Sequence, residues 1–118
     1  MSEVVFYRCD KCHNLVAVVE KGTCVPQCCG QPMTKLEAGS VDAAAEKRAD
    51  GKVKVQVGDV EHPMLEAHSI QWIALSSPDR LEIRYLHPGE KPAAEFDCDG
   101  AEDVTIYEYC NLHGLWKA

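Results

Sequence analysis

The sequence contains no apolar run that approaches the roughly 20 residues needed to cross a bilayer. Its first ten residues, "MSEVVFYRCD", lack the basic and apolar regions of a secretory signal. Internal repeats and low-complexity tracts are also missing. With 46% hydrophobic and 26% charged residues, the composition is that of an ordinary globular domain. The sequence therefore predicts a cytoplasmic protein that does not bind membranes.

Positive charge is scarce as well. Twelve Lys and Arg residues stand against nineteen Asp and Glu residues, which gives a net charge of −7. Broad nucleic-acid binding needs a basic surface, so this balance argues against a nucleic-acid partner. It also means that an anionic substrate needs a local positive patch to offset the field of the whole chain.

Helical periodicity is nearly absent, whereas short alternating runs bounded by turn residues are frequent, so the predicted fold class is all-β. Residues 1–37 form a unit too small to fold without a bound metal. Residues 38–52 indicate a linker or shortened loop, in which "VDAAAEKR" is compatible with one or two helical turns. Residues 53–118 predict an antiparallel β-sandwich or partial barrel. The expected strands are "VVFYR", "LVAVV", "PMTKLE", "VKVQVG", "SIQWIAL", "RLEIRYL", "AAEFDC" and "DVTIYEYC".

Seven cysteines without an export signal indicate metal ligation, because the cytosol keeps thiols reduced and an odd number cannot pair completely. Cys9 and Cys12 have the spacing that lets two thiolates of one turn face one tetrahedral metal. Further along come adjacent Cys28 and Cys29, whose side chains tend to diverge, so a shared metal should have a distorted tetrahedron. Cys24 could replace one of the adjacent pair, but it is interpreted as an apolar filler or a spare thiol.

A second set of candidate ligands lies in the C-terminal part. His62 and His68 flank a loop ahead of an expected strand, and Pro63 stiffens the approach of His62. Cys110 ends a strand, and the turn after it allows His113 to curl back beside it. Three imidazoles and one thiolate suit ferrous iron as well as zinc, so the sequence predicts a second metal site.

Further histidines and cysteines are interpreted as non-ligands. His13 is expected in an exposed turn with a left-handed backbone. The stretch "CDKCH" also matches covalent haem attachment, but such haem proteins are exported and mainly helical. His87 in the turn "YLHPGEK" could serve as a substitute ligand, but it is expected to face solvent. Cys98 is expected to be a thiol at a strand end. A weaker hypothesis makes Cys24 and Cys98 the oxidation-sensitive thiols of a redox sensor.

These motifs together resemble the desulfoferrodoxin family of superoxide reductases. "CDKC" and "CCGQPM" are similar to the desulforedoxin domain, and "VGDVEHPMLEAHSIQWI" and "CNLHGLW" to the neelaredoxin-type catalytic domain. The resemblance covers nearly the whole chain and implies an immunoglobulin-like β-sandwich after the small unit. It implies a rubredoxin-like iron held by Cys9, Cys12, Cys28 and Cys29. It also implies a catalytic iron with equatorial His62, His68 and His113 and axial Cys110.

The activity that the resemblance implies is one-electron reduction of superoxide to hydrogen peroxide. Imidazoles keep the iron ferrous and leave one axial position open, and the opposite thiolate pushes electron density toward that position. Because no dioxygen is made, a separate electron donor is required. The implied partners are superoxide, a reduced rubredoxin-like donor and a second copy of the chain in a homodimer.

One departure from the family pattern concerns a histidine. The family carries a fourth equatorial histidine in a loop Glu-Lys-His-x-Pro, whereas no histidine lies between His13 and His62 here. The region reads "AAAEKRADGKVKV". Either Glu46-Lys47 is the remnant of that motif, with Arg48 where the histidine is expected, or Glu46-Lys47 matches a later Glu-Lys and the whole loop is deleted. Lys47 is the candidate for attracting superoxide. Other cations that could supply the charge are Arg48, Lys52 and Lys54. The alternative is a non-catalytic electron-transfer or metal-binding protein whose three-histidine, one-cysteine site is structural or holds zinc.

Overall fold

The computed structural model describes residues 4–40, 44–49, 52–57, 69–91, 93–97, 104–111 and 114–117. The chain divides into two compact units, Glu3–Glu37 and Ala38–Ala118, the second of which also includes Met1–Ser2. All regular structure in these ranges is β-strand, which confirms the all-β fold class. No helix in them is long and apolar enough to cross a membrane.

The unit Glu3–Glu37 is built from two small sheets. Its strands are β1 Phe6–Arg8, β2 Leu15–Ala17, β3 Gln27–Cys28, β4 Gln31–Pro32 and β5 Thr34–Lys35. One sheet has the order β2-β1-β5, and the other is the β3-β4 hairpin. Among its described residues only Phe6, Cys9 and Met33 are buried. So small a core needs a further source of stability, which a metal bound by cysteines can supply.

Two larger sheets make up the second unit. Their strands are β6 Gly39–Ser40, β7 Ala44–Ala49, β8 Lys52–Val57, β9 Ile70–Ser77, β10 Arg80–Tyr85, β11 Ala93–Asp97, β12 Thr105–Cys110 and β13 Gly114–Lys117. One sheet has the order β10-β9-β12-β13-β6, and the other has the order β11-β8-β7. The pairing of β13 with β6 is parallel, and all the other pairs in these two sheets are antiparallel.

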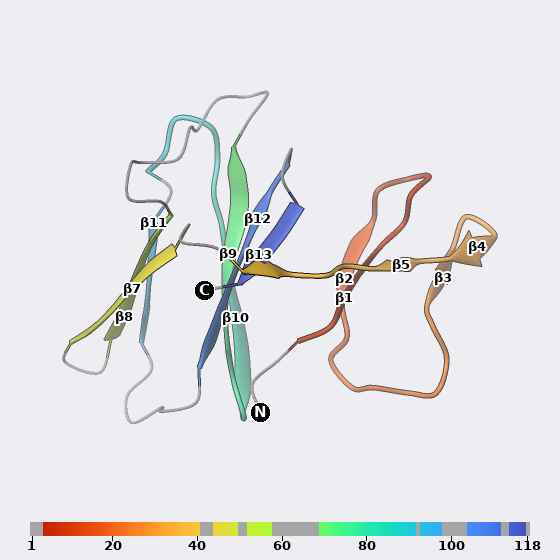
Figure 1. Cartoon of the computed structure of the whole chain (residues 1–118), viewed down its shortest axis with the longest axis horizontal. Coiled ribbons are helices and arrows are strands. Elements are labelled where there is room, and N and C mark those ends of the chain that lie inside the picture. The colour runs from red at the N-terminus through yellow and green to blue at the C-terminus, as the bar shows by residue number, and fades with distance from the viewer. Residues whose placement is uncertain are drawn as a thin grey trace. The chain divides into compact units, whose positions relative to one another are not determined.

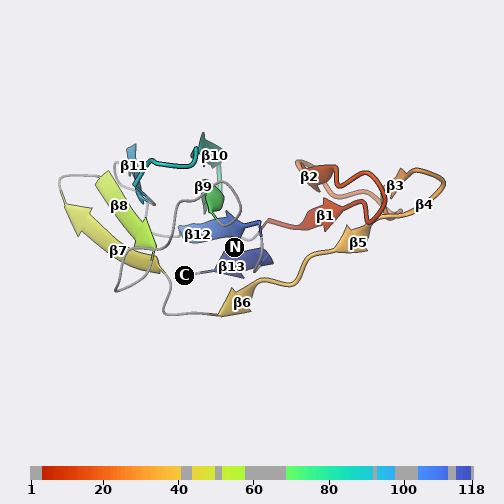
Figure 2. The same ribbon diagram turned by 90° about the horizontal axis from the view of Figure 1, so that it is seen from above.

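The two sheets of this unit form separate layers, as Figure 1 shows from the side and Figure 2 from above. A single apolar core joins them. It consists of Ile70, Ile73 and Leu75 of β9, Ile106 and Cys110 of β12, Val55 of β8 and Phe96 of β11. Because side chains alternate across a strand, every second residue of β12 points into this core. A thiol, that of Cys110, therefore lies at its end.

The expected strands are confirmed as β1, β2, β5 and β8 to β12, with shifted ends. Two further strands, β6 and β7, lie in the stretch interpreted as a linker or shortened loop. The helical turns considered for "VDAAAEKR" are wrong. Strand β7 instead pairs with β8 along its whole length, from Ala44 opposite Val57 to Ala49 opposite Lys52. An isolated helix of one or two turns has little stability, so the segment forms a strand paired with β8 instead.

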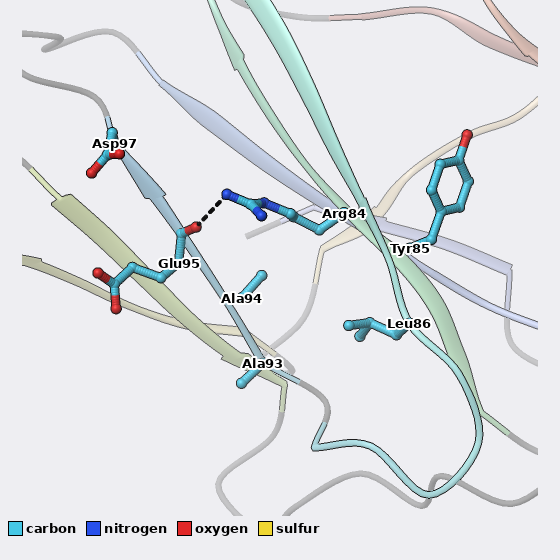
Figure 3. A pocket seen from close by; sticks show the side chains of 7 residues that line it. All are labelled: Arg84, Tyr85, Leu86, Ala93, Ala94, Glu95 and Asp97. Carbon is cyan, nitrogen blue, oxygen red and sulfur yellow. Dashed lines mark hydrogen bonds between the residues drawn. The ribbon is translucent and has the colours of Figure 1, made fainter.

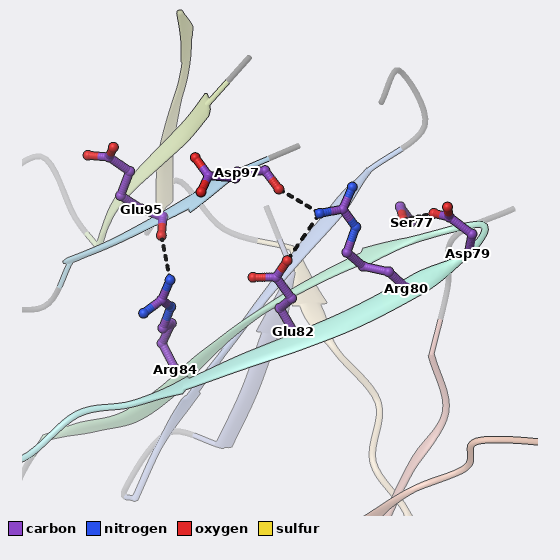
Figure 4. Close-up of polar contacts among 7 residues, drawn as sticks. All are labelled: Ser77, Asp79, Arg80, Glu82, Arg84, Glu95 and Asp97. Carbon is purple, nitrogen blue, oxygen red and sulfur yellow. Dashed lines mark hydrogen bonds and ion pairs between the residues drawn. The ribbon is translucent and has the colours of Figure 1, made fainter. Parts of the chain in front are cut away.

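Two arginines of β10, an edge strand of one sheet, form hydrogen bonds to β11, an edge strand of the other. We call the line where these two strands meet the seam. Arg80 Nη1 donates to the Asp97 carbonyl at 2.6 Å and to Glu82 Oε1 at 3.2 Å, as Figure 4 shows. Arg84 Nη2 donates to the Glu95 carbonyl at 3.4 Å. Both carbonyls belong to β11, an edge strand of its sheet, so the arginines occupy acceptors of an otherwise open edge. A groove of about 410 Å³ lies beside this seam, and Arg84 points across it in Figure 3.

Candidate metal centres

The first cysteine pair lies in the loop that joins β1 to β2. The Cys9 N–H donates to the Asn14 carbonyl at 2.8 Å, and the His13 N–H donates to the Cys9 carbonyl at 2.9 Å. The Cys12 N–H is directed at Cys9 Sγ at 3.4 Å. His13 is exposed with a φ of 69°, which confirms the expected left-handed turn residue. These backbone bonds fold the loop around the Cys9 sulfur.

The second pair lies on a two-residue hairpin. Cys28 ends β3 and pairs with Gln31, the first residue of β4, so Cys29 and Gly30 form the connection. Both connecting residues have positive φ, 54° and 75°, as the tightest hairpin turns require. Cys28 Sγ and Cys29 Sγ are only 3.9 Å apart. Adjacent side chains tend to diverge, but the left-handed backbone at Cys29 accompanies a short distance between these two sulfurs.

The two pairs converge on one group of four sulfurs. The Sγ atoms of Cys9, Cys12, Cys28 and Cys29 all lie within 4.8 Å of one another. Cys12 Sγ and Cys28 Sγ are 3.5 Å apart. A tetrahedral metal with thiolate bonds of about 2.3 Å keeps its sulfurs about 3.8 Å apart, so the spacing fits a metal ion. Cys9 is buried, whereas Cys12 and Cys29 are exposed.

The electrostatics of this group also fit a cation. Hydrogen bonding from the Cys12 backbone N–H is the main cause that lowers the pKa of Cys9 to about 6. Hydrogen bonding with the Cys12 side chain raises the pKa of Cys28 and raises that of Cys29 to about 12. Four thiols this close cannot all ionise, because the negative thiolates repel one another. A metal cation at the centre offsets this repulsion.

Neighbouring side chains tie the two loops together. Asn14 Nδ2 donates to Cys28 Sγ at 3.8 Å and so links the β1–β2 loop to the β3–β4 hairpin. Thr34 Oγ1 donates to Asp10 Oδ2 at 2.7 Å and links the same loop to β5. Cys24 is not in the four-sulfur group; it is exposed and lines a separate groove of about 260 Å³. Of its two interpretations, the apolar filler is wrong, and the exposed thiol agrees with a spare cysteine.

The described part of the second candidate site is the end of β12. Cys110 is 0% exposed and lies between two strands, opposite Ile70 of β9 and Gly114 of β13. The pairing of Cys110 with Gly114 leaves residues 111–113 as the β12–β13 connection. Gly114 has a φ of 84°, a left-handed conformation that favours glycine. Strand β9 carries one extra residue between its partners for Cys110 and Tyr109, so the ladder is bulged at this end.

His62, His68, His113 and Cys98 lie outside the described residues. In the chain, His68 directly precedes Ser69, and His113 directly precedes Gly114. Ser69 directly precedes β9, and Gly114 is the first residue of β13; these two strands flank Cys110. His87 is described, and it is exposed in a turn closed by its own N–H on Glu90 Oε1 at 2.7 Å, as expected.

The cations considered in the sequence lie on one hairpin. Lys47 of β7 stands opposite Lys54 of β8, Arg48 opposite Val53, and Ala49 opposite Lys52. Strand pairing thus places Lys47, Arg48, Lys52 and Lys54 within six ladder positions. The sequence alone left their proximity open, because it did not predict β7.

Glu108 is a buried acidic residue that sequence reasoning missed. It is 1% exposed, and β-alternation places it on the core face of β12 between Ile106 and Cys110. Neither carboxylate oxygen has a hydrogen-bond partner among the described residues. Burial raises the pKa of Glu108 to about 7. The available signal was the glutamate at an inward position of "TIYEYC".

A small unit with a four-thiolate metal site, followed by a two-sheet β-unit with a buried cysteine at a strand end, defines a class of two-part β metalloproteins. The family model for the desulfoferrodoxin N-terminal domain matches residues 2–36, and the model for desulfoferrodoxin matches residues 36–118. The chain belongs to the desulfoferrodoxin family.

Individual relatives agree along nearly the full length. The chain is 44% identical to the desulfoferrodoxin of Desulfarculus baarsii, over 95% of this chain and 93% of that protein. It is 44% identical to the desulfoferrodoxin of Nitratidesulfovibrio vulgaris over the same shares. The crystal structure of the superoxide reductase from Treponema pallidum matches 100% of this chain and 99% of that chain, with a TM-score of 0.84. Its sequence identity is 24%, so this likeness shows the fold alone.

Proposed function

We propose that this chain reduces superoxide to hydrogen peroxide at a site that contains Cys110. Each turnover takes up one superoxide anion, one electron and two protons and releases one hydrogen peroxide. Family membership with 44% identity over 95% of the chain supports this activity. The observation that carries it is Cys110, a fully buried thiol between two strands, of which β13 begins directly after His113 and β9 begins two residues after His68.

Two irons complete the proposal. Cys9, Cys12, Cys28 and Cys29 hold the first, and His62, His68, His113 and Cys110 hold the second. When bound and ferrous, the second iron supplies the electron that superoxide accepts. The apolar core around Cys110 keeps water away from its sulfur. The thiolate would therefore keep its capacity to donate electron density to the metal. Lys47 on the cationic β7–β8 hairpin attracts the superoxide anion.

The remaining parts of the proposal follow from the same assignment. Residues 1–37 act as the electron-transfer domain, and 53–118, to whose sheets 38–52 add β6 and β7, act as the catalytic domain. Cys12 and Cys29 are exposed, so an electron donor can approach the four-cysteine site closely. We assign a rubredoxin-like protein as that donor, a homodimer as the assembly, and the cytoplasm as the compartment, since the thiolates must stay reduced.

The test mixes the reduced, iron-loaded chain with superoxide under anaerobic conditions. We expect one hydrogen peroxide for each superoxide consumed, with one oxidised second site and no dioxygen. Cys110→Ala should slow this reaction by at least about 100-fold, since losing a metal ligand exceeds the effect of losing an outer contact. Cys24→Ala removes a thiol outside the four-sulfur group and serves as the matched control. Dioxygen production, or equal rates for Cys110→Ala and wild type, contradicts the proposal.

The second candidate function is a non-catalytic electron-transfer or metal-binding protein. It is favoured by one observation, the absence of a histidine between His13 and His62. In this case the site of three histidines and one cysteine is structural or holds zinc, and four ligands suffice for a closed tetrahedral site. Metal analysis of the protein from its native cells separates the two. Stoichiometric zinc that resists chelation and does not react with superoxide favours this second function.

A further inference from the structure

Asn111 and Ser69 form a reciprocal pair of hydrogen bonds across 42 positions of the chain. The Ser69 N–H donates to Asn111 Oδ1 at 2.9 Å. In return, the Asn111 N–H donates to the Ser69 carbonyl at 3.2 Å. Ser69 is 5% exposed, so its N–H has little access to water as an alternative partner. We call this pair the Asn111–Ser69 clamp.

The clamp continues the β9–β12 ladder by one step with a side chain in place of a backbone carbonyl. The ladder ends where Cys110 stands opposite Ile70, after the bulge in β9. At Asn111 the chain turns toward β13. The side-chain oxygen lets the chain turn there while the Ser69 N–H stays paired. An asparagine supplies this acceptor with little loss of rotamer freedom, whereas leucine or alanine supplies none.

The position of the clamp is what connects it to function. Asn111 directly follows Cys110, and Ser69 directly follows His68. The same Asn111 Oδ1 also lies 3.9 Å from Cys110 Sγ. Two hydrogen bonds therefore fix the backbone one residue away from each of two ligands of the proposed second site.

We infer that Asn111 is a positioning residue, which holds Ser69, the chain neighbour of His68, against the Cys110 end of β12 at the spacing that the second metal requires. The inference rests on the proposed function to the extent that His68 and Cys110 serve one metal. Outer contacts of this kind orient metal ligands without touching the metal.

The test measures the hydrogen bond and the metal separately in the full iron-loaded chain. In Asn111→Ala, amide exchange at Ser69 should be faster by at least about tenfold, because the N–H loses its acceptor. Ferrous iron at the second site should bind about 10- to 100-fold more weakly, measured by chelator competition. Asn111→Asp keeps the acceptor and should restore the slow Ser69 exchange. Slow amide exchange in the central parts of β9 and β12, away from the clamp, reports whether the second unit of each variant is folded.

Two control variants separate positioning from general stability. Ser69→Ala keeps both backbone groups of the clamp and should leave exchange and affinity as in wild type. Ser77→Ala removes the 2.9 Å bond from Ser77 Oγ to Asp79 Oδ1 at the other end of β9. It should reduce stability without changing affinity at the second site. The inference is overturned if Asn111→Ala leaves Ser69 exchange unchanged, or if its metal affinity matches that of Ser77→Ala.

None of these measurements uses superoxide. A wild-type chain that binds iron at Cys110 but does not react with superoxide overturns the proposed activity and leaves the clamp supported by its own data. A wild-type chain that reacts with superoxide while Asn111→Ala keeps full metal affinity overturns the clamp alone.

Discussion

The buried surroundings of Glu108 disfavour the ionised form of its carboxyl group. It is 1% exposed, lies two residues from Cys110 on the core face of β12, and has no hydrogen-bond partner among the described residues. Burying a carboxyl group in this way costs free energy that an apolar side chain of similar size does not. Retaining such a residue next to a proposed metal ligand is typical of sites where function is kept at the expense of stability.

Replacing Glu108 by leucine should therefore stabilise the fold. We expect Glu108→Leu to raise the free energy of unfolding by about 1–3 kcal/mol, since it removes a buried polar group that has no partner in the described part of the chain. Urea unfolding of metal-loaded wild type and variant measures the difference. Glu108→Gln, which keeps a polar group at the same place, should gain much less. A leucine variant less stable than wild type would contradict the view that the carboxyl group is unpaired.

The β3–β4 hairpin is the element that makes the four-cysteine site possible. Its two-residue connection requires positive φ at both Cys29 and Gly30. Glycine adopts this conformation freely, but a cysteine does so at a cost of about 1–3 kcal/mol. The convergence of four sulfurs within 4.8 Å, together with a bound metal, can offset that strain.

Gly30→Ala should add strain to this hairpin without a steric clash. The alanine Cβ meets no atom within 4 Å, so the expected loss of about 1–2 kcal/mol comes from the left-handed backbone alone. The measurement is the chelator concentration needed to remove metal from the four-cysteine site, which should fall. Gly22→Ala is the matched control in the same unit, because its Cβ also meets nothing and its φ is not left-handed. Equal metal retention in the two variants would show that the turn does not limit the site.

Charge is distributed unevenly over the whole molecule. Glu3–Glu37 contains four basic and four acidic residues, whereas the rest of the chain contains eight basic and fifteen acidic residues. Half of those eight basic residues belong to the β7–β8 hairpin. A local cluster of positive charge on a negative body can attract an anion at short range, within a Debye length of about 10 Å at 0.1 M salt.

Lys47→Ala should slow the second-order reaction with superoxide by up to about tenfold at low ionic strength. The difference from wild type should shrink as salt is added, because salt screens the attraction. Pulse radiolysis at several salt concentrations measures both effects. Lys91→Ala removes the same charge from an exposed loop position and keeps the net charge of the two variants equal. Equal rates for the two variants would exclude a specific role for Lys47.

The success of sequence reasoning depended on how local each feature is. The strands β8 to β12 were predictable because each is a short run rich in apolar and β-branched residues that turn residues bound. Strand β7 was not, because "AAEKRA" is not such a run and forms only through its pairing with β8. The roles of Glu108 and Asn111 were not predicted for a related reason. Each role depends on the residues that face it from other strands.

The sequence by itself determined the donor atoms and the local turns of this protein. Cys9-x2-Cys12 and the adjacent pair at Cys28 each lie within one short turn, whose geometry depends on neighbouring residues alone. The tertiary structure decided which turns meet. Cys12 and Cys28 approach across 16 positions, where the β1–β2 loop meets the β3–β4 hairpin. Ser69 approaches Asn111 across 42 positions, because β9 and β12 pack their apolar faces into one core. Such packing depends on the whole chain, so no local spacing can encode it.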